Sequence, residues 1–150
     1  MYIKDLDRCT YFGVDCDAVI AVGWLARGHE FTQGAVEPAF FERVTTLAES
    51  PWEPVVFAGC HECDLCQFPA ARFSENLFVP DDGRLFAAPV AITHYITAHW
   101  YRPPAEFVRA VLKCPEMSSM EYKKAVLANG GREFLQALKE RQADVAPDSY

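Results

Sequence analysis

The sequence predicts an α+β fold, in which a small antiparallel sheet, three to five helices and a zinc knuckle form a single globular domain spanning residues 1–150. Three observations support this prediction. Most segments rich in β-forming residues precede residue 88, and most helical patterns follow it. A chain of 150 residues has the size of one domain, and a hydrophobic content of 51% allows a buried core. The stretch GCHECDLC at 59–66 concentrates cysteine and histidine in mid-chain.

The first half of the chain is expected to contain two strands and one helix. Residues 17–25, DAVIAVGWL, form the first strand because they are rich in valine, isoleucine and tryptophan. A helix runs from Pro38, which fits a first helical turn, to about Glu49. Residues 52–58 form the second strand. One face of the helix points to the core and comprises Phe40, Phe41, Val44, Leu47 and Ala48.

A hairpin is expected next, followed by a helix. Residues 75–79 and 84–87 form its two strands, and PDDG at 80–83 is a tight-turn sequence. The helix opens at Pro89 and runs to about His99.

Two further helical segments are expected near the C-terminus. Pro103-Pro104 starts one of them, and Ser118 or Ser119 caps the next, which Asn129-Gly130-Gly131 breaks in two. The tail from about Ala143 is expected to be disordered. The core-facing residues of these helices are Phe107, Val108, Val111, Leu112, Phe134, Leu135 and Leu138.

The charge balance excludes some functions. The chain has 14 basic and 21 acidic residues, a net charge of −7, and its densest basic stretch, 113–141, also carries glutamates. We therefore expect no nucleic-acid binding. No apolar run approaches the roughly 20 residues of a membrane span, and no secretory signal is visible, so we expect a cytoplasmic protein without membrane association. A basic protein partner remains possible, and the acidity also serves solubility.

The cysteine cluster predicts a metal site. Cys60, Cys63 and Cys66 form two overlapping C-x-x-C pairs, and such a turn lets two thiolates converge on one Zn²⁺. In a cytosolic chain, clustered cysteines bind metal or catalyse more often than they form disulfides. The competing interpretation is that they are reduced core residues. The remaining cysteines are scattered: Cys9, Cys16 and Cys114.

A second pair of ligands can come from His94 and His99, which have the spacing H-x₄-H. On an ideal helix, residues five apart are separated by about 140°, so both reach one ion only if the helix loosens near its end. Pro103 makes an irregular last turn plausible.

Other chemistries fit this stretch less well. An iron–sulfur run would need a cysteine where Ala70 stands. Residues 67–69 do not begin the helix that a thioredoxin-type pair requires, and the zinc-deaminase pattern is absent. A structural zinc is favoured over a catalytic one. A catalytic zinc usually has a nearby general base, and Glu62, the only carboxylate placed to act as one, is expected to be a solvated loop residue. His29-Glu30 is expected to be surface.

The stretches GCHECDLC, 88–112 and VGWLARGHEF (22–31) resemble a group of small uncharacterised bacterial proteins with no assigned function. The pattern of this group is a G-x-H-x-C-x-x-C knuckle followed by A-P-x-x-I-x-H-Y-x-x-x-H-x-Y-x-P-P-x-x-F, and the resemblance covers residues 2–112. It implies the ligand set Cys63, Cys66, His94 and His99, with His61 and Cys60 as substitutes.

The expected function is a structural zinc site that scaffolds a protein-interaction surface in a bacterial-type protein, and an enzymatic role is not favoured. One alternative is a zinc-dependent hydrolase with an open coordination position. Another is an acidic inhibitor, or immunity-type binder, of a basic protein. The sequence does not determine the oligomeric state.

Overall fold

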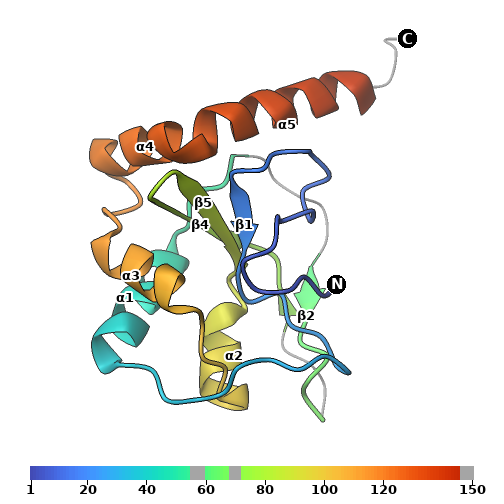
Figure 1. The fold of residues 1–150 in the computed structure, drawn as a ribbon, viewed down its shortest axis with the longest axis vertical. Coiled ribbons are helices and arrows are strands. Elements are labelled where there is room, and N and C mark those ends of the chain that lie inside the picture. The colour runs from blue at the N-terminus through green and yellow to red at the C-terminus, as the bar shows by residue number, and fades with distance from the viewer. Residues whose placement is uncertain (55–59, 68–71, 146–150) are drawn as a thin grey trace.

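The computed structural model describes residues 1–54, 60–67 and 72–145. It has the α+β class that the sequence predicts (Figure 1). The central sheet has the strand order β1-β5-β4, with β1 at Val19–Ala21, β5 at Arg84–Pro89 and β4 at Asn76–Asp81. The β4–β5 hairpin is antiparallel. The β1–β5 pairing is parallel, so the sheet is mixed and the prediction of an antiparallel sheet was wrong for this pair. The long connection between the two strands lets the chain return in the same direction.

The N-terminal segment covers the outer edge of β1. The backbone N–H of Leu6 donates to the carbonyl of Ala21 at 2.8 Å, and that of Cys9 donates to Val19 at 2.8 Å. An exposed edge would present unpaired N–H and C=O groups. These bonds satisfy that edge.

The helices surround the sheet (Figure 1). α4 and α5 cross one end, α2 lies at the other end, and α1 and α3 lie side by side. None of the helices in the described ranges is long and apolar enough to cross a membrane. Their bounds are α1 Pro38–Glu49, α2 Ile92–His99, α3 Ala105–Lys113, α4 Met120–Val126 and α5 Arg132–Val145, with a π-helical turn, η1, at Leu127–Gly131.

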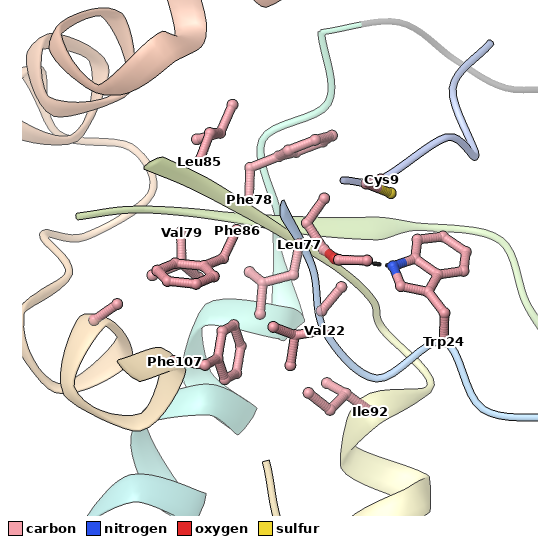
Figure 2. Packing of buried hydrophobic residues seen from close by; sticks show 14 of the residues in the cluster. Cys9, Val22, Trp24, Leu77, Phe78, Val79, Leu85, Phe86, Ile92 and Phe107 are labelled. Carbon is pink, nitrogen blue, oxygen red and sulfur yellow. Dashed lines mark hydrogen bonds between the residues drawn. The ribbon is translucent and has the colours of Figure 1, made fainter. Parts of the chain in front are cut away.

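The core lies between the sheet and the helices (Figure 2). Phe86 of β5 and Phe107 of α3 meet edge to face, with ring centroids 5.9 Å apart. Trp24 is fully buried, and its indole N–H donates to the carbonyl of Ala87 at 2.9 Å, drawn as a dashed line in Figure 2. An unsatisfied buried donor would cost about 1–3 kcal/mol. The bond therefore fixes the chain after β1 against the sheet.

Most element predictions are confirmed. α1 has its predicted bounds, with Pro38 in its first turn. Ser119 caps α4, because its side chain accepts a hydrogen bond from the N–H of Tyr122 at 3.1 Å. Asn129 and Gly130 have non-helical backbone angles, so the chain kinks where the sequence predicted a break.

The hairpin turn is tighter than predicted. Pro80 lies inside β4, and the turn is made by Asp82 and Gly83, both with positive φ. Proline is tolerated there because β4 is an edge strand, where a missing N–H need not break a ladder. Pro89 ends β5 and does not open a helix, and α2 begins at Ile92.

Three predictions differ in part from the structure. Residues 52–54 are not in a strand, and 55–58 of that predicted strand lie outside the described residues. Leu112 is 50% exposed, and Ala110 of α3 is buried. α5 continues to Val145, so the first residues of the expected tail are helical, and 146–150 lie outside the described ranges.

Candidate metal centre

Four side chains from two distant segments converge on one point. Cys63 and Cys66 come from the knuckle, the turn at residues 63–66, and His94 and His99 come from α2. Their ligand atoms all lie within 4.8 Å of one another. The Cys63 and Cys66 sulfurs are 3.6 Å apart. Nε2 of His94 is 3.2 Å from the Cys66 sulfur, and Nε2 of His99 is 3.3 Å from the Cys63 sulfur and 3.5 Å from that of Cys66.

These separations are close to those of a tetrahedral metal site. Bond lengths of about 2.3 Å to sulfur and 2.1 Å to nitrogen place two thiolates about 3.8 Å apart, and a thiolate and an imidazole nitrogen about 3.6 Å apart. The observed sulfur–sulfur distance is 3.6 Å, and the three sulfur–nitrogen distances run from 3.2 to 3.5 Å. Thiol–imidazole hydrogen bonds have similar lengths, but the single proton of Cys66 cannot serve three close neighbours. A shared ion would satisfy all four atoms together.

Contacts with the chain on two sides fix the position of the knuckle. It follows β2 (His61–Glu62), which pairs with β3 (Arg72–Phe73), and the Arg72 guanidinium lies 2.7 Å from the Glu62 carboxylate. On the other side, the backbone N–H of Arg27 donates to the Asp64 carboxylate at 3.0 Å. The Arg27 guanidinium donates to the carbonyl of Cys66 at 3.3 Å.

The helix supplies two imidazoles without loosening inside its length. α2 ends at His99, and Trp100 adopts a left-handed conformation with φ 57°. The N–H groups of Trp100 and Tyr101 both donate to the carbonyl of Tyr95, which closes the last turn. The expected irregularity therefore falls immediately after the second ligand. Both histidines face the cluster with Nε2, the ring nitrogen farther from the backbone, which provides the reach that their angular separation requires.

Burial shifts the pKa of two of the candidate ligands. Cys63 is fully buried, and burial raises the pKa of its thiol. Burial, and secondarily the charge of His99, lowers the pKa of His94, so its imidazole stays neutral and able to donate a lone pair. With a divalent cation bound, two thiolates and two neutral imidazoles would balance its charge, which would reduce the cost of burying it.

The other candidate ligands do not join this cluster in the described part of the chain. Cys60 is exposed and is not a member, and the side chain of His61 lies outside the described residues. Burial raises the pKa of both Cys9 and Cys114 to about 12, so these thiols are poor nucleophiles and poor ligands. Glu62, considered as a general base, is paired with Arg72.

Several supporting residues were not evident from the sequence. The sequence patterns did not single out Arg27, yet this residue contacts the knuckle at two points. The Phe73 ring lies 5.7 Å from the His94 ring, and the Gln33 amide donates to the carbonyl of His99 at 3.2 Å. All of these are contacts between distant segments, which residue spacing does not reveal.

Comparison with known proteins gives one match. Residues 1–112 match a family described as a domain of unknown function, DUF7919. That range contains the whole cluster, and its extent agrees with the expected resemblance to proteins without an assigned function. No curated protein and no solved structure matches the chain.

Proposed function

This chain belongs to the DUF7919 family, whose description assigns no activity, and we propose that its described site is a structural Zn²⁺ centre that supports a protein-interaction surface. The observation that carries the proposal is the convergence of two sulfurs and two imidazole nitrogens within 4.8 Å of one another. The ion would join the knuckle to the C-terminal end of α2. The free state of all six cysteines fits a reducing compartment such as the cytoplasm.

The donor set favours zinc over other metals. Calcium and magnesium prefer oxygen ligands, whereas two thiolates and two imidazoles in a tetrahedral arrangement are typical of zinc. The overlap of C-x-x-C pairs also suggested an iron–sulfur cluster, but Cys60 lies outside the group and the histidines are inside it.

A structural role is favoured over hydrolysis. A catalytic zinc keeps one position open for water, with three protein ligands. Here four protein donors are close enough to fill the tetrahedral shell. The hydrolase alternative requires one of these donors to lie outside the shell when metal is bound.

The interaction surface lies beside the centre. An open hollow of about 460 Å³ is lined by Leu65 of the knuckle, the ligand His99, Trp100, Phe31, Gln33 and Ala98. The Trp100 side chain is 59% exposed, and tryptophan is enriched at the energetic centres of protein interfaces. Because Leu65 and His99 come from the two segments that the metal would join, metal binding would shape this hollow.

Metal content and coordination test the proposal. We expect protein purified without added metal to contain one zinc ion per chain. We also expect zinc K-edge absorption to resolve two sulfur and two nitrogen neighbours. A metal content near zero would contradict the proposal. A three-ligand shell with a bound water would instead favour the hydrolase.

A second experiment tests the surface. Trp100→Ala should weaken recovery of a partner from native cells while preserving zinc content, because it removes the largest exposed side chain of the hollow. Met120→Ala, at an equally exposed position on α4, is the matched control. Equal recovery with both variants would argue against an interaction at Trp100.

A further inference from the structure

A second feature of the molecule, separate from the metal centre, is an apolar groove between α1 and α3. α3 buries one face, which comprises Phe107, Ala110 and Val111. A second apolar stripe on the same helix, Val108 and Leu112, lines the groove, and Leu112 is 50% exposed. α3 therefore carries more apolar surface than the described part of the fold covers.

The size of the groove indicates what it can hold. Its volume is about 270 Å³, slightly below the roughly 300–1,000 Å³ of sites for small molecules and cofactors. Its floor contains Phe40, which is fully buried, and Val36. An apolar floor of this size suits one or two side chains of a docking segment better than a complete cofactor.

The charged residues around the groove indicate what kind of ligand it can bind. Arg102 and Arg109 line it, both are exposed, and neither belongs to an ion pair among the described residues. Glu37 is the only carboxylate in the lining. The groove therefore carries a local excess of positive charge on a chain with a net charge of −7. Screening in physiological salt limits charge effects to about 8 Å, so the local excess decides which ligand binds here.

We propose that the α1–α3 groove binds an acidic, amphipathic segment of a partner protein. One or two large apolar side chains of that segment occupy the floor, and its carboxylates pair with Arg102 and Arg109. The specificity is opposite to that expected from net charge alone, which favours a basic partner. A second copy of this chain as the occupant is one of the outcomes that the test below distinguishes.

Selection from random peptides on the chain of residues 1–150 tests the proposal. A display library of about twelve-residue random peptides is selected on the wild type. The expected enriched sequences combine leucine or phenylalanine with several aspartates or glutamates. The strongest peptide is then measured by fluorescence anisotropy. Its affinity should fall severalfold when the salt concentration rises from about 0.05 to 0.3 M.

Variants locate the binding. The double variant R102E/R109E and the single variant L112D should each weaken the peptide at least about tenfold. R132E changes an exposed arginine on α5 and is the matched control, which should leave the affinity unchanged. Zinc content and melting temperature, measured on every variant, show that the fold and the metal centre are intact.

Three results would overturn the proposal. One is the absence of enriched peptides, and another is enrichment of basic sequences. The third is a dimer in light scattering that L112D converts to a monomer, since a second copy would then occupy the groove.

Discussion

Cys60 and Cys63 are close neighbours in the sequence and have opposite surroundings in the structure. Cys63 is fully buried, and its sulfur faces Cys66 and His99, whereas Cys60 is exposed and outside the cluster. A serine oxygen at residue 63 would be a weaker zinc ligand than a thiolate. Because the site is buried, loss of the ion would leave the remaining donors buried without a partner.

Cys63→Ser should therefore abolish tight metal binding and lower stability. Ligand linkage gives roughly 3–4 kcal/mol of stabilisation when free metal exceeds its Kd by a few hundredfold. We expect a loss of this size from the free energy of unfolding, measured by urea titration in metal-replete buffer. A chelator should destabilise the wild type and leave the variant unaffected.

Cys60→Ser is the matched control for this experiment. It changes the same residue type in the same segment, but at an exposed position outside the cluster. The free energy of unfolding should stay within about 0.5 kcal/mol of the wild-type value. The metal content should equal that of the wild type within experimental error. Equal losses in both variants would mean that Cys60 is also a ligand.

The protonation of the ligands predicts how metal affinity depends on pH. Burial raises the pKa of Cys63, so the metal must displace a proton from this thiol over a wide range of pH. Affinity should thus rise with pH, by about tenfold per unit for each thiol still protonated. The pKa of His94 is lowered, so this imidazole remains a ligand below the usual histidine range. Competition with a chromophoric chelator at several pH values measures this slope, and a constant affinity would contradict it.

At the level of single residues, the sequence predicted the candidate ligands better than their surroundings. Residue type and spacing indicated the histidine pair and three candidate cysteines, since few side chains bind zinc. The resemblance to a group of uncharacterised proteins implied the choice of Cys63 and Cys66, which lie close to His94 and His99 in the structure. The roles of Arg27 and Phe73 depend on tertiary contacts and were not predictable. Leu112 was placed in the core because helical spacing does not distinguish a buried face from an adjacent apolar stripe.

At the level of elements, segments with explicit terminal signals were predicted best. Pro38 and Ser119 marked helix starts through local chemistry, and the structure places α1 and α4 accordingly. The parallel pairing of β1 with β5 joins segments more than 60 residues apart, and no local pattern encodes it. Pro80 looked like a turn residue because its tolerance in β4 depends on the position of that strand at the edge of the sheet.

The kink between α4 and α5 depends on a glycine. Gly130 has φ 90°, and a β-carbon there would collide with the side chain of Ala18. The neighbouring Asn129 accepts a hydrogen bond from the N–H of Gly83 at 2.7 Å, which fixes the kink on the hairpin turn. The close approach leaves no room for a larger residue.

Gly130→Ala should destabilise the protein by about 3 kcal/mol, from backbone strain and overpacking together. Gly28 is the matched control, because it has φ 89° but open space around its Cα. Gly28→Ala should cost only the strain, about 1 kcal/mol. Urea unfolding of both variants measures the difference. Similar losses would show that the contact with Ala18 does not restrict residue 130.

At the level of the whole molecule, the proposed metal centre and the main core would stabilise different parts of the fold. The core packs the three-stranded sheet against helices through aromatic residues such as Phe78, Phe86 and Phe107. The knuckle lies between the two short paired strands β2 and β3, and it is attached to the rest through Arg27, the candidate ligands and the packing of Leu65 against the core. A short two-stranded hairpin is marginal by itself. A bound metal would therefore add a second attachment of the knuckle beside its packing against the core.

Metal removal should accordingly loosen one region and leave the rest folded. In hydrogen–deuterium exchange with and without chelator, we expect faster exchange in residues 60–67 and in the last turn of α2. The amides of β5 and α5 should keep their protection, because local opening follows local contacts and need not involve the core. Peptides from α4 and α5, at the opposite end of the sheet from α2 (Figure 1), provide an internal control. If exchange instead rose uniformly along the chain, the ion would be a condition for the whole fold, as in small zinc fingers. The metal would then act as a folding cofactor, and its loss would unfold the proposed surface at Trp100 together with the rest of the protein.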